Sequence, residues 1–152
     1  QIRVDLLHDM SSSRAFGKFL ETHPEYRKAI IMGEPDYLLE SLPYYAPNSI
    51  YIPREGRFGN WVLFTQANRE RLSLSELLGI AREVKNREKR PVLIALGLFD
   101  ISKYPGCELR YPPNKVFTVS SKGLTRFRAE TDKVAEFKSA VLDENYEIYL
   151  FH

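Results

Sequence analysis

The sequence predicts an α/β domain with a mainly parallel sheet and flanking helices, in a Rossmann-like, three-layer arrangement that ends in a β-hairpin. Three observations lead to this prediction. Short apolar runs alternate with amphipathic helical segments between residues 29 and 96. A capping box starts the best-defined helix, directly before the longest apolar run. Turn residues precede a strand-like segment at residues 146–151. With 152 residues, 43% of them hydrophobic, the chain is long enough for one soluble domain spanning residues 1–152.

The first predicted helix follows a cluster of serines at residues 11–13, which are good N-cap residues. Phe16, Phe19 and Leu20 follow at helical spacing, and Pro24 ends the segment. These positions predict an amphipathic helix with one aromatic face.

A β-α-β unit is predicted next. Residues 29–32 and 49–52 are short apolar runs of strand length. Pro35 is well placed for the first turn of a helix between them. The inner face of that helix consists of three leucines, Leu38, Leu39 and Leu42. Such a unit closes right-handed with parallel strands, so both strands are expected in one sheet.

A loop at residues 53–60 and a third strand at 61–64 are expected before the capped helix. In the capping box, Ser73 and Glu76 satisfy each other's free backbone donors. The helix leads into an apolar run at residues 92–96, which predicts another strand of the same parallel sheet.

The last third of the chain has weaker signals. Residues 97–114 contain several prolines and glycines and are interpreted as a long connection. A strand is predicted at 115–119, followed by a helix capped by Ser120 or Ser121. Residues 139–142 and 146–151 are predicted to pair as a hairpin around the turn residues between them.

Composition excludes several functions. The chain carries 22 basic and 20 acidic residues, so its net charge of +2 gives no reason to expect a nucleic-acid partner. One cysteine, Cys107, excludes an internal disulfide, and the three histidines share no metal-ligand spacing. Nucleophile-elbow, phosphate-loop and dinucleotide motifs are missing, and no apolar run approaches the ~18 residues of a membrane span. We therefore expect no metal and no other cofactor.

Topology selects the candidate site. In parallel α/β sheets, ligands bind outside the carboxyl ends of the strands. The loops that follow the predicted strands bring six charged residues to that edge: Glu34, Asp36, Arg54, Glu55, Arg57 and Asp100. They suit a sugar or phosphate site, or an acid/base pair. The alternative is structural, because a helix dipole favours acids at the helix start and an arginine neutralises them.

The kind of ligand depends on which side chains are available at this edge. An anionic ligand, such as a polyprenyl-phosphate sugar, suits the forked donors of Arg54 and Arg57. A neutral glycan depends more on Tyr44, Tyr45 and Trp61, whose rings pack on sugars. Adjacent tyrosines also suit the plain role of covering the end of a helix.

Four segments carry a family resemblance. They are Ser11-Ser12-Ser13-Arg14-Ala15, Met32-Gly33-Glu34-Pro35-Asp36-Tyr37, Tyr51-Ile52-Pro53-Arg54-Glu55-Gly56-Arg57-Phe58-Gly59 and Asp143-Glu144-Asn145-Tyr146-Glu147-Ile148-Tyr149-Leu150. In this order the chain resembles the soluble C-terminal domain that follows the membrane bundle in bacterial proteins similar to GT-C glycosyltransferases. The types concerned are the dolichyl-phosphate-mannose mannosyltransferases and the lipid A aminoarabinose transferases.

The resemblance implies an accessory domain on the extracytoplasmic, periplasmic face of a bacterial membrane. In such proteins the catalytic acid and the polyprenyl-phosphate site belong to the membrane portion, so no catalysis is expected of this chain itself. Its partners would be its own upstream transmembrane bundle and a sugar or polyprenyl-phosphate ligand. The opening residues Gln1-Ile2-Arg3 are typical of a fragment of a longer protein. The alternatives are a free-standing small-molecule binding domain and a carboxylate-dependent enzyme.

Overall fold

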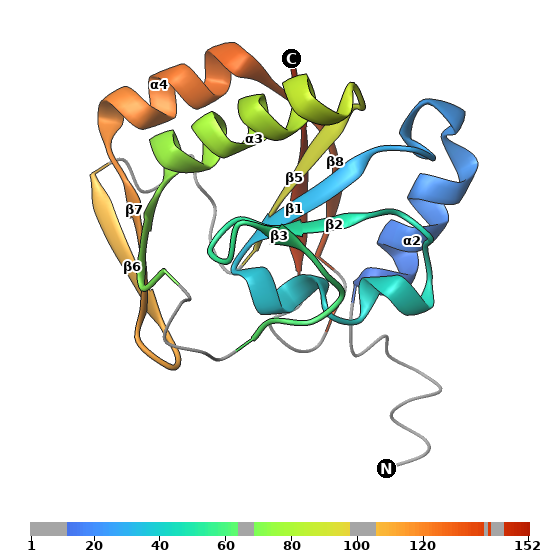
Figure 1. Ribbon diagram of the computed structural model, residues 1–152, viewed down its shortest axis with the longest axis horizontal. Coiled ribbons are helices and arrows are strands. Elements are labelled where there is room, and N and C mark those ends of the chain that lie inside the picture. The colour runs from blue at the N-terminus through green and yellow to red at the C-terminus, as the bar shows by residue number, and fades with distance from the viewer. Residues whose placement is uncertain (1–11, 64–68, 98–105, 139, 141–144) are drawn as a thin grey trace.

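The computed structural model describes residues 12–63, 69–97, 106–138, 140 and 145–152. These residues form a mixed α/β fold with two sheets (Figure 1). The larger sheet has six strands in the order β3-β2-β1-β5-β9-β8, and the smaller has three in the order β4-β7-β6.

The centre of the larger sheet is parallel. β1 (Ile30–Glu34) lies between β2 (Ile50–Ile52) and β5 (Val92–Gly97), and runs parallel to both. Its residues are buried throughout, as expected for a strand covered on both faces. The prediction that these three apolar runs share one parallel sheet is confirmed.

The larger sheet as a whole is mixed, so the prediction of a mainly parallel sheet is wrong. β9 (Tyr146–Phe151) runs antiparallel to β5, and β8 (Thr131–Phe137) runs antiparallel to β9. β3 (Arg57–Phe58) pairs antiparallel with β2 inside the predicted loop. Gly56 makes this tight turn possible with a φ of 65°. The segment 61–63 is not a strand, and residue 64 lies outside the described residues.

The C-terminal pair of strands is antiparallel as predicted, but its first strand lies earlier in the chain. β8 covers Thr131–Phe137 rather than residues 139–142, of which all but 140 lie outside the described residues. Its exposed charges, Asp132, Lys133 and Glu136, obscure the strand pattern. They are suitable for an edge strand, because charge there prevents pairing with other chains.

The smaller sheet was not expected. β7 (Lys115–Val119) pairs with β4 (Arg71–Ser73) in parallel and with β6 (Cys107–Tyr111) antiparallel. β6 lies within the segment interpreted as a connection, where prolines and glycines on both sides hid its short alternating pattern. The predicted strand at 115–119 therefore exists, but in a separate sheet.

Three helices are formed where the sequence predicts them: α2 (Ser13–Thr22), α3 (Leu74–Glu88) and α4 (Ser121–Glu130). The capping box of α3 is present in full, with the Glu76 amide donating to Ser73 Oγ at 3.2 Å. Ser120 caps α4 by accepting from the Gly123 amide at 3.0 Å. None of the helices in the described part of the chain has the length and apolarity needed to cross a membrane.

The helix expected after Pro35 is instead two 3-10 turns, η2 (Asp36–Leu39) and η3 (Leu42–Tyr44). Pro43 explains the interruption, because it lacks an amide donor and its ring would clash with the carbonyl four residues earlier. The three predicted leucines are nonetheless buried.

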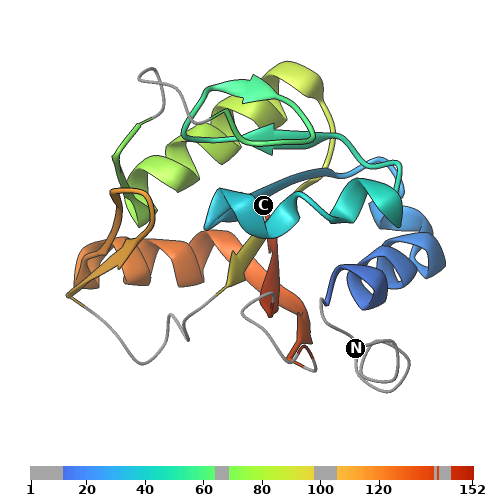
Figure 2. The ribbon, with the colours of Figure 1, turned by 90° about the horizontal axis from the view of Figure 1, so that it is seen from below.

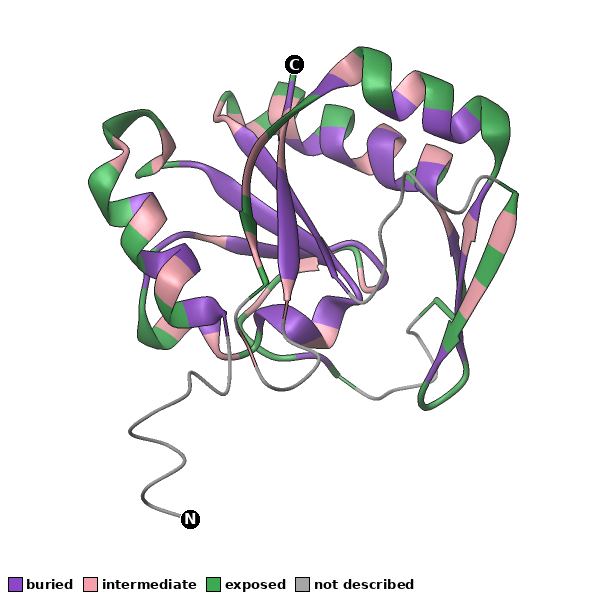
Figure 3. Ribbon diagram, turned by 180° about the vertical axis from the view of Figure 1, so that it is seen from behind, coloured by how far each residue is buried: buried purple, intermediate pink, exposed green. Residues whose placement is uncertain are grey.

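Helices cover both faces of the central strands (Figures 1 and 2). Ile30 and Met32 of β1 belong to the core shared with α3, α4 and the smaller sheet. Ile31 points the other way, into the core shared with α2, η2 and η3. Figure 3 shows the continuous burial of the central strands between these two layers.

Candidate functional site at the carboxyl ends of the parallel strands

An ion pair joins the ends of β1 and β2. Glu34 is the last residue of β1, and Arg54 follows β2 by two residues. Arg54 Nη2 lies 2.6 Å from Glu34 Oε1, and Arg54 Nε donates to Glu34 Oε2 at 3.1 Å. Both side chains are fully buried. A forked arginine contact of this kind is among the stronger polar contacts in proteins.

Arg54 also binds the smaller sheet. Its Nη1 donates to the carbonyl oxygens of Arg69 at 2.9 Å and Glu70 at 2.8 Å, directly before β4. Its Nη2 donates to the carbonyl of Val116 in β7 at 3.2 Å. Every nitrogen of the guanidinium therefore donates to the protein itself. Arg54 thus connects the parallel strands to the smaller sheet.

Tyr111 of β6 completes the contact. Its hydroxyl donates to Glu34 Oε1 and accepts from Arg54 Nε at 3.0 Å. The Arg54 guanidinium also lies 5.4 Å from the centre of the Tyr111 ring, within the range of a cation–π contact. The carboxylate and the guanidinium consequently share one hydroxyl.

A second buried ion pair lies next to the first. Lys115 Nζ, at the start of β7, lies 2.7 and 2.8 Å from the two carboxylate oxygens of Asp36, at the start of η2. The side chains are 5% and 2% exposed. We call these five residues, Glu34, Asp36, Arg54, Tyr111 and Lys115, the buried ion network.

Burial raises the pKa of Glu34 to about 7, although Arg54 acts to lower it. A pKa near neutrality is the range used by general acids and bases. However, both carboxylate oxygens of Glu34 are bound by Arg54, and one of them also by Tyr111. This geometry favours a structural role, in which the network fastens the two sheets together.

Glu55 and Arg57 form a separate pair on the β2–β3 hairpin. Arg57 Nη2 lies 2.6 Å from Glu55 Oε2 and donates to the Trp61 carbonyl at 3.0 Å. Glu55 Oε1 accepts from the Leu63 amide at 2.6 Å. The guanidinium crosses Gly59 so closely that a Cβ there would lie 2.2 Å from Arg57 Nη1. The pair therefore holds the segment 61–63 against the hairpin.

The structure thus brings Glu34, Asp36 and Arg54 together and places Glu55 and Arg57 on the neighbouring turn. Asp100 lies outside the described residues.

Tyr111 and Lys115 were missed by the sequence analysis, although each has a signal. Tyr111 shares one strand face with Cys107 and Leu109, whereas the charged Glu108 and Arg110 lie on the opposite face. Lys115 lies on the same strand face as the buried Phe117 and Val119 of β7. A lysine at a buried position requires a carboxylate partner.

Four aromatic side chains near η3 and the β2–β3 hairpin are exposed. Tyr44 is 86% exposed, Trp61 63%, Tyr45 48% and Phe58 38%. We call these four residues the aromatic edge. The Val62 amide donates to Glu40 Oε1 at 2.9 Å, which holds the segment carrying Trp61 beside the 3-10 turns that carry the tyrosines. Large exposed aromatic groups gathered in one region are typical of binding surfaces.

A hollow of about 370 Å³ adjoins the aromatic edge, between α2 and η3. Tyr45 lines it together with the exposed, oppositely charged side chains of Glu21 and Arg27. Gly17 lets α2 approach Tyr45 closely, because a Cβ at this position would lie 2.5 Å from Tyr45 Cβ. An aromatic wall beside a few polar groups is the usual composition of a small-molecule site.

No group of three or more histidine, cysteine or acidic side chains within the described ranges is placed to hold a metal ion. Comparisons with protein-family models, curated proteins and solved structures find no match. The geometry of this edge is therefore the basis for a functional proposal.

Proposed function

We propose that the chain is a non-catalytic accessory domain that binds a neutral glycan through the aromatic edge. One contrast carries the proposal. The charged groups of the predicted site that the structure describes are all engaged in ion pairs, whereas Tyr44, Tyr45 and Trp61 present their rings to solvent. A ligand at the aromatic edge therefore meets exposed ring surface.

Both arginines of the site are already bonded to protein groups, which favours a neutral ligand over an anionic one. Arg54 is buried and fully bonded, and Arg57 is bound to Glu55 and the Trp61 carbonyl. Binding a phosphate there would require breaking existing charge-assisted bonds. Tyrosine and tryptophan rings offer a flat apolar surface with a polar edge, which matches the face of a sugar ring.

The parent would be a membrane protein similar to GT-C glycosyltransferases, with this domain on the extracytoplasmic face and packed on its own transmembrane bundle. The resemblance of the four sequence segments supports this part of the proposal. The Rossmann-like description of the fold is also a proposal, supported by the parallel β1, β2 and β5 and the helices on both faces. In this assignment the domain contributes acceptor or sugar binding, and the chemistry belongs to the membrane portion.

Trp61 allows a direct test, because it is the only tryptophan in the chain. We expect its fluorescence to change on titration with neutral oligosaccharides at millimolar concentration. Calorimetry should show that Trp61→Ala and Tyr44→Ala bind at least tenfold more weakly, whereas Lys122→Ala, on the exposed surface of α4, binds like the wild type. No change in fluorescence and no heat of binding with any neutral glycan would refute the proposal. Turnover of a glycosyl substrate that a single carboxylate substitution abolishes would also refute it.

A further inference from the structure

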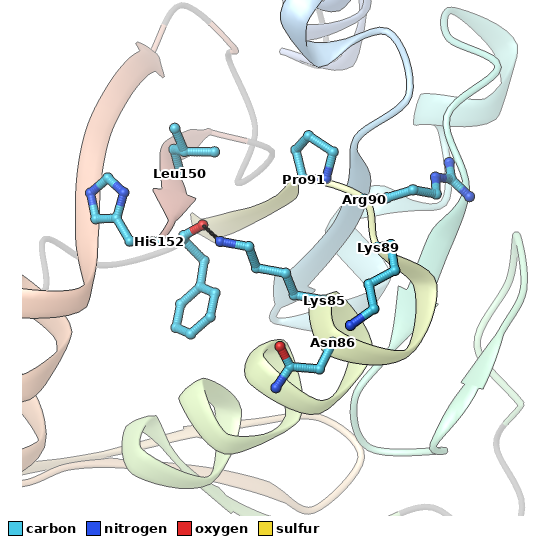
Figure 4. A pocket seen from close by; sticks show the side chains of 8 residues that line it. Lys85, Asn86, Lys89, Arg90, Pro91, Leu150 and His152 are labelled. Carbon is cyan, nitrogen blue, oxygen red and sulfur yellow. Dashed lines mark hydrogen bonds between the residues drawn. The ribbon is translucent and has the colours of Figure 1, made fainter.

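A second hollow lies in the larger sheet beside the amino end of β5. It has a volume of about 470 Å³ and lies between the last turn of α3, the start of β5 and the end of β9 (Figure 4). This volume falls within the range of about 300–1,000 Å³ that is usual for small-molecule sites. None of the residues that line it is acidic.

Two lysines of α3 supply positive charge to the hollow. Lys85 lies in the last turn of α3 and Lys89 is its C-cap, and both line the hollow. Lys85 Nζ donates to the Phe151 carbonyl at 3.4 Å and lies 5.7 Å from the centre of its ring. The side chain of Lys89 makes no ion pair or hydrogen bond with the described residues. An anion bound in the hollow would be attracted by both ammonium groups.

The other charged groups nearby are already engaged. Arg90 donates to the Lys28 carbonyl at 2.7 Å and to Ser49 Oγ at 3.2 Å, and Figure 4 shows its guanidinium turned away from Lys85. His152 Nε2 lies 2.8 Å from Asp132 Oδ2 at the rim. Lys89, together with Lys85 and its single long hydrogen bond of 3.4 Å, therefore supplies the positive charge in the hollow.

The backbone of Lys89 gives an independent observation. It is the only non-glycine residue among the described positions with a positive φ, at 53°. It ends α3 in the left-handed conformation, which glycine normally supplies at this position. A side chain retained where glycine would be less strained is a feature of functional sites. Here that side chain is an ammonium group at the rim of a basic hollow.

We propose that this hollow binds the phosphate group of a small organic phosphoester. Lys85 and Lys89 bind the phosphate oxygens, with the Asn86 side chain as a further donor. Pro91 and Leu150 form an apolar wall for the organic part of the ligand. The site is separate from the aromatic edge, so the proposal of phosphate binding does not depend on the proposal of glycan binding.

The test uses glycerol 3-phosphate at low ionic strength, followed by amide chemical shifts. We expect perturbations confined to residues 85–91 and 150–152. Lys89→Gly and Lys85→Gln should each weaken binding at least tenfold, while Lys122→Gln, which removes one exposed lysine of α4, leaves it unchanged. Vesicles containing phosphatidic acid, compared with phosphatidylcholine alone, determine whether the phosphoester is a lipid headgroup or a free metabolite.

Lys89→Gly also separates a functional role from a structural one. Glycine relieves the left-handed conformation, so the midpoint of thermal unfolding should rise while phosphate binding is lost. A more stable variant that binds as well as the wild type would overturn the proposal. So would unchanged spectra of the wild type with both glycerol 3-phosphate and phosphatidic acid vesicles.

Discussion

The guanidinium of Arg54 contacts both carboxylate oxygens of Glu34, at 2.6 and 3.1 Å, and neither side chain is exposed to solvent. Twenty residues separate them along the chain. Because Arg54 also donates to the Glu70 carbonyl, directly before β4, and to the Val116 carbonyl in the neighbouring β7, the pair joins β1, β2, β4 and β7. Two of the residues predicted to bind a ligand thus hold the two sheets together.

Arg54→Met should destabilise the fold by about 3–5 kcal/mol, because it leaves the Glu34 carboxylate buried without its partner. Arg71→Met is the matched control. Arg71 pairs with Glu108 at the surface, where the side chains are 63% and 34% exposed. We expect this control to change stability by less than about 1 kcal/mol. Urea unfolding of both variants measures the difference, and equal losses would show that the buried pair has no special role.

Glu34 should make stability fall as the pH rises from 4.5 to about 7. The folded state retains the proton of Glu34 up to its raised pKa of about 7, whereas the unfolded chain releases it near 4.5. The folded state therefore binds more protons in this window, and each unit of pKa difference corresponds to about 1.4 kcal/mol.

Glu34→Gln should remove this component, so its unfolding free energy should depend less on pH between 4.5 and 7. Glu108→Gln serves as the control. Its hydrogen bond to Arg71 lowers the pKa of Glu108, so its contribution is present above pH 4.5 and is lost below it. Identical profiles for the wild type and Glu34→Gln above pH 4.5 would contradict the assignment.

Gly17→Ala and Gly79→Ala should have opposite effects, although both glycines lie within helices. A Cβ at Gly17 would lie 2.5 Å from Tyr45 Cβ and 2.9 Å from the Tyr45 carbonyl oxygen, so we expect a loss of about 1–3 kcal/mol from overpacking. Nothing lies within 4 Å of a Cβ at Gly79. That variant should gain up to about 1 kcal/mol from helix propensity. The midpoint of thermal unfolding measures the stability of each variant. A higher midpoint for Gly17→Ala would mean that η3 packs less closely on α2.

Local patterns in the sequence were enough to predict three α-helices and the parallel centre of the sheet, although not the 3-10 turns after Pro35. The spacing of Phe16 and Leu20, the capping box at Ser73 and Glu76, and the apolar run at 92–96 each involve residues only a few positions apart. Hydrogen bonds of a helix and the alternation of a strand act over that same distance. For this reason α2, α3, β1, β2 and β5 were all predicted correctly.

The direction of β9, the smaller sheet and the partners of the buried charges depended on tertiary structure. Lys115 meets Asp36 across 79 residues of chain, and Tyr111 meets Glu34 across 77. The sequence placed Glu34, Asp36 and Arg54 at one edge by topology, yet the same residue types suit a ligand site and a structural ion network. Only burial distinguishes the two, because a charge removed from water must find its counter-charge inside the protein. For Asp36 that counter-charge is Lys115 of β7, a strand whose position in space no local pattern reveals.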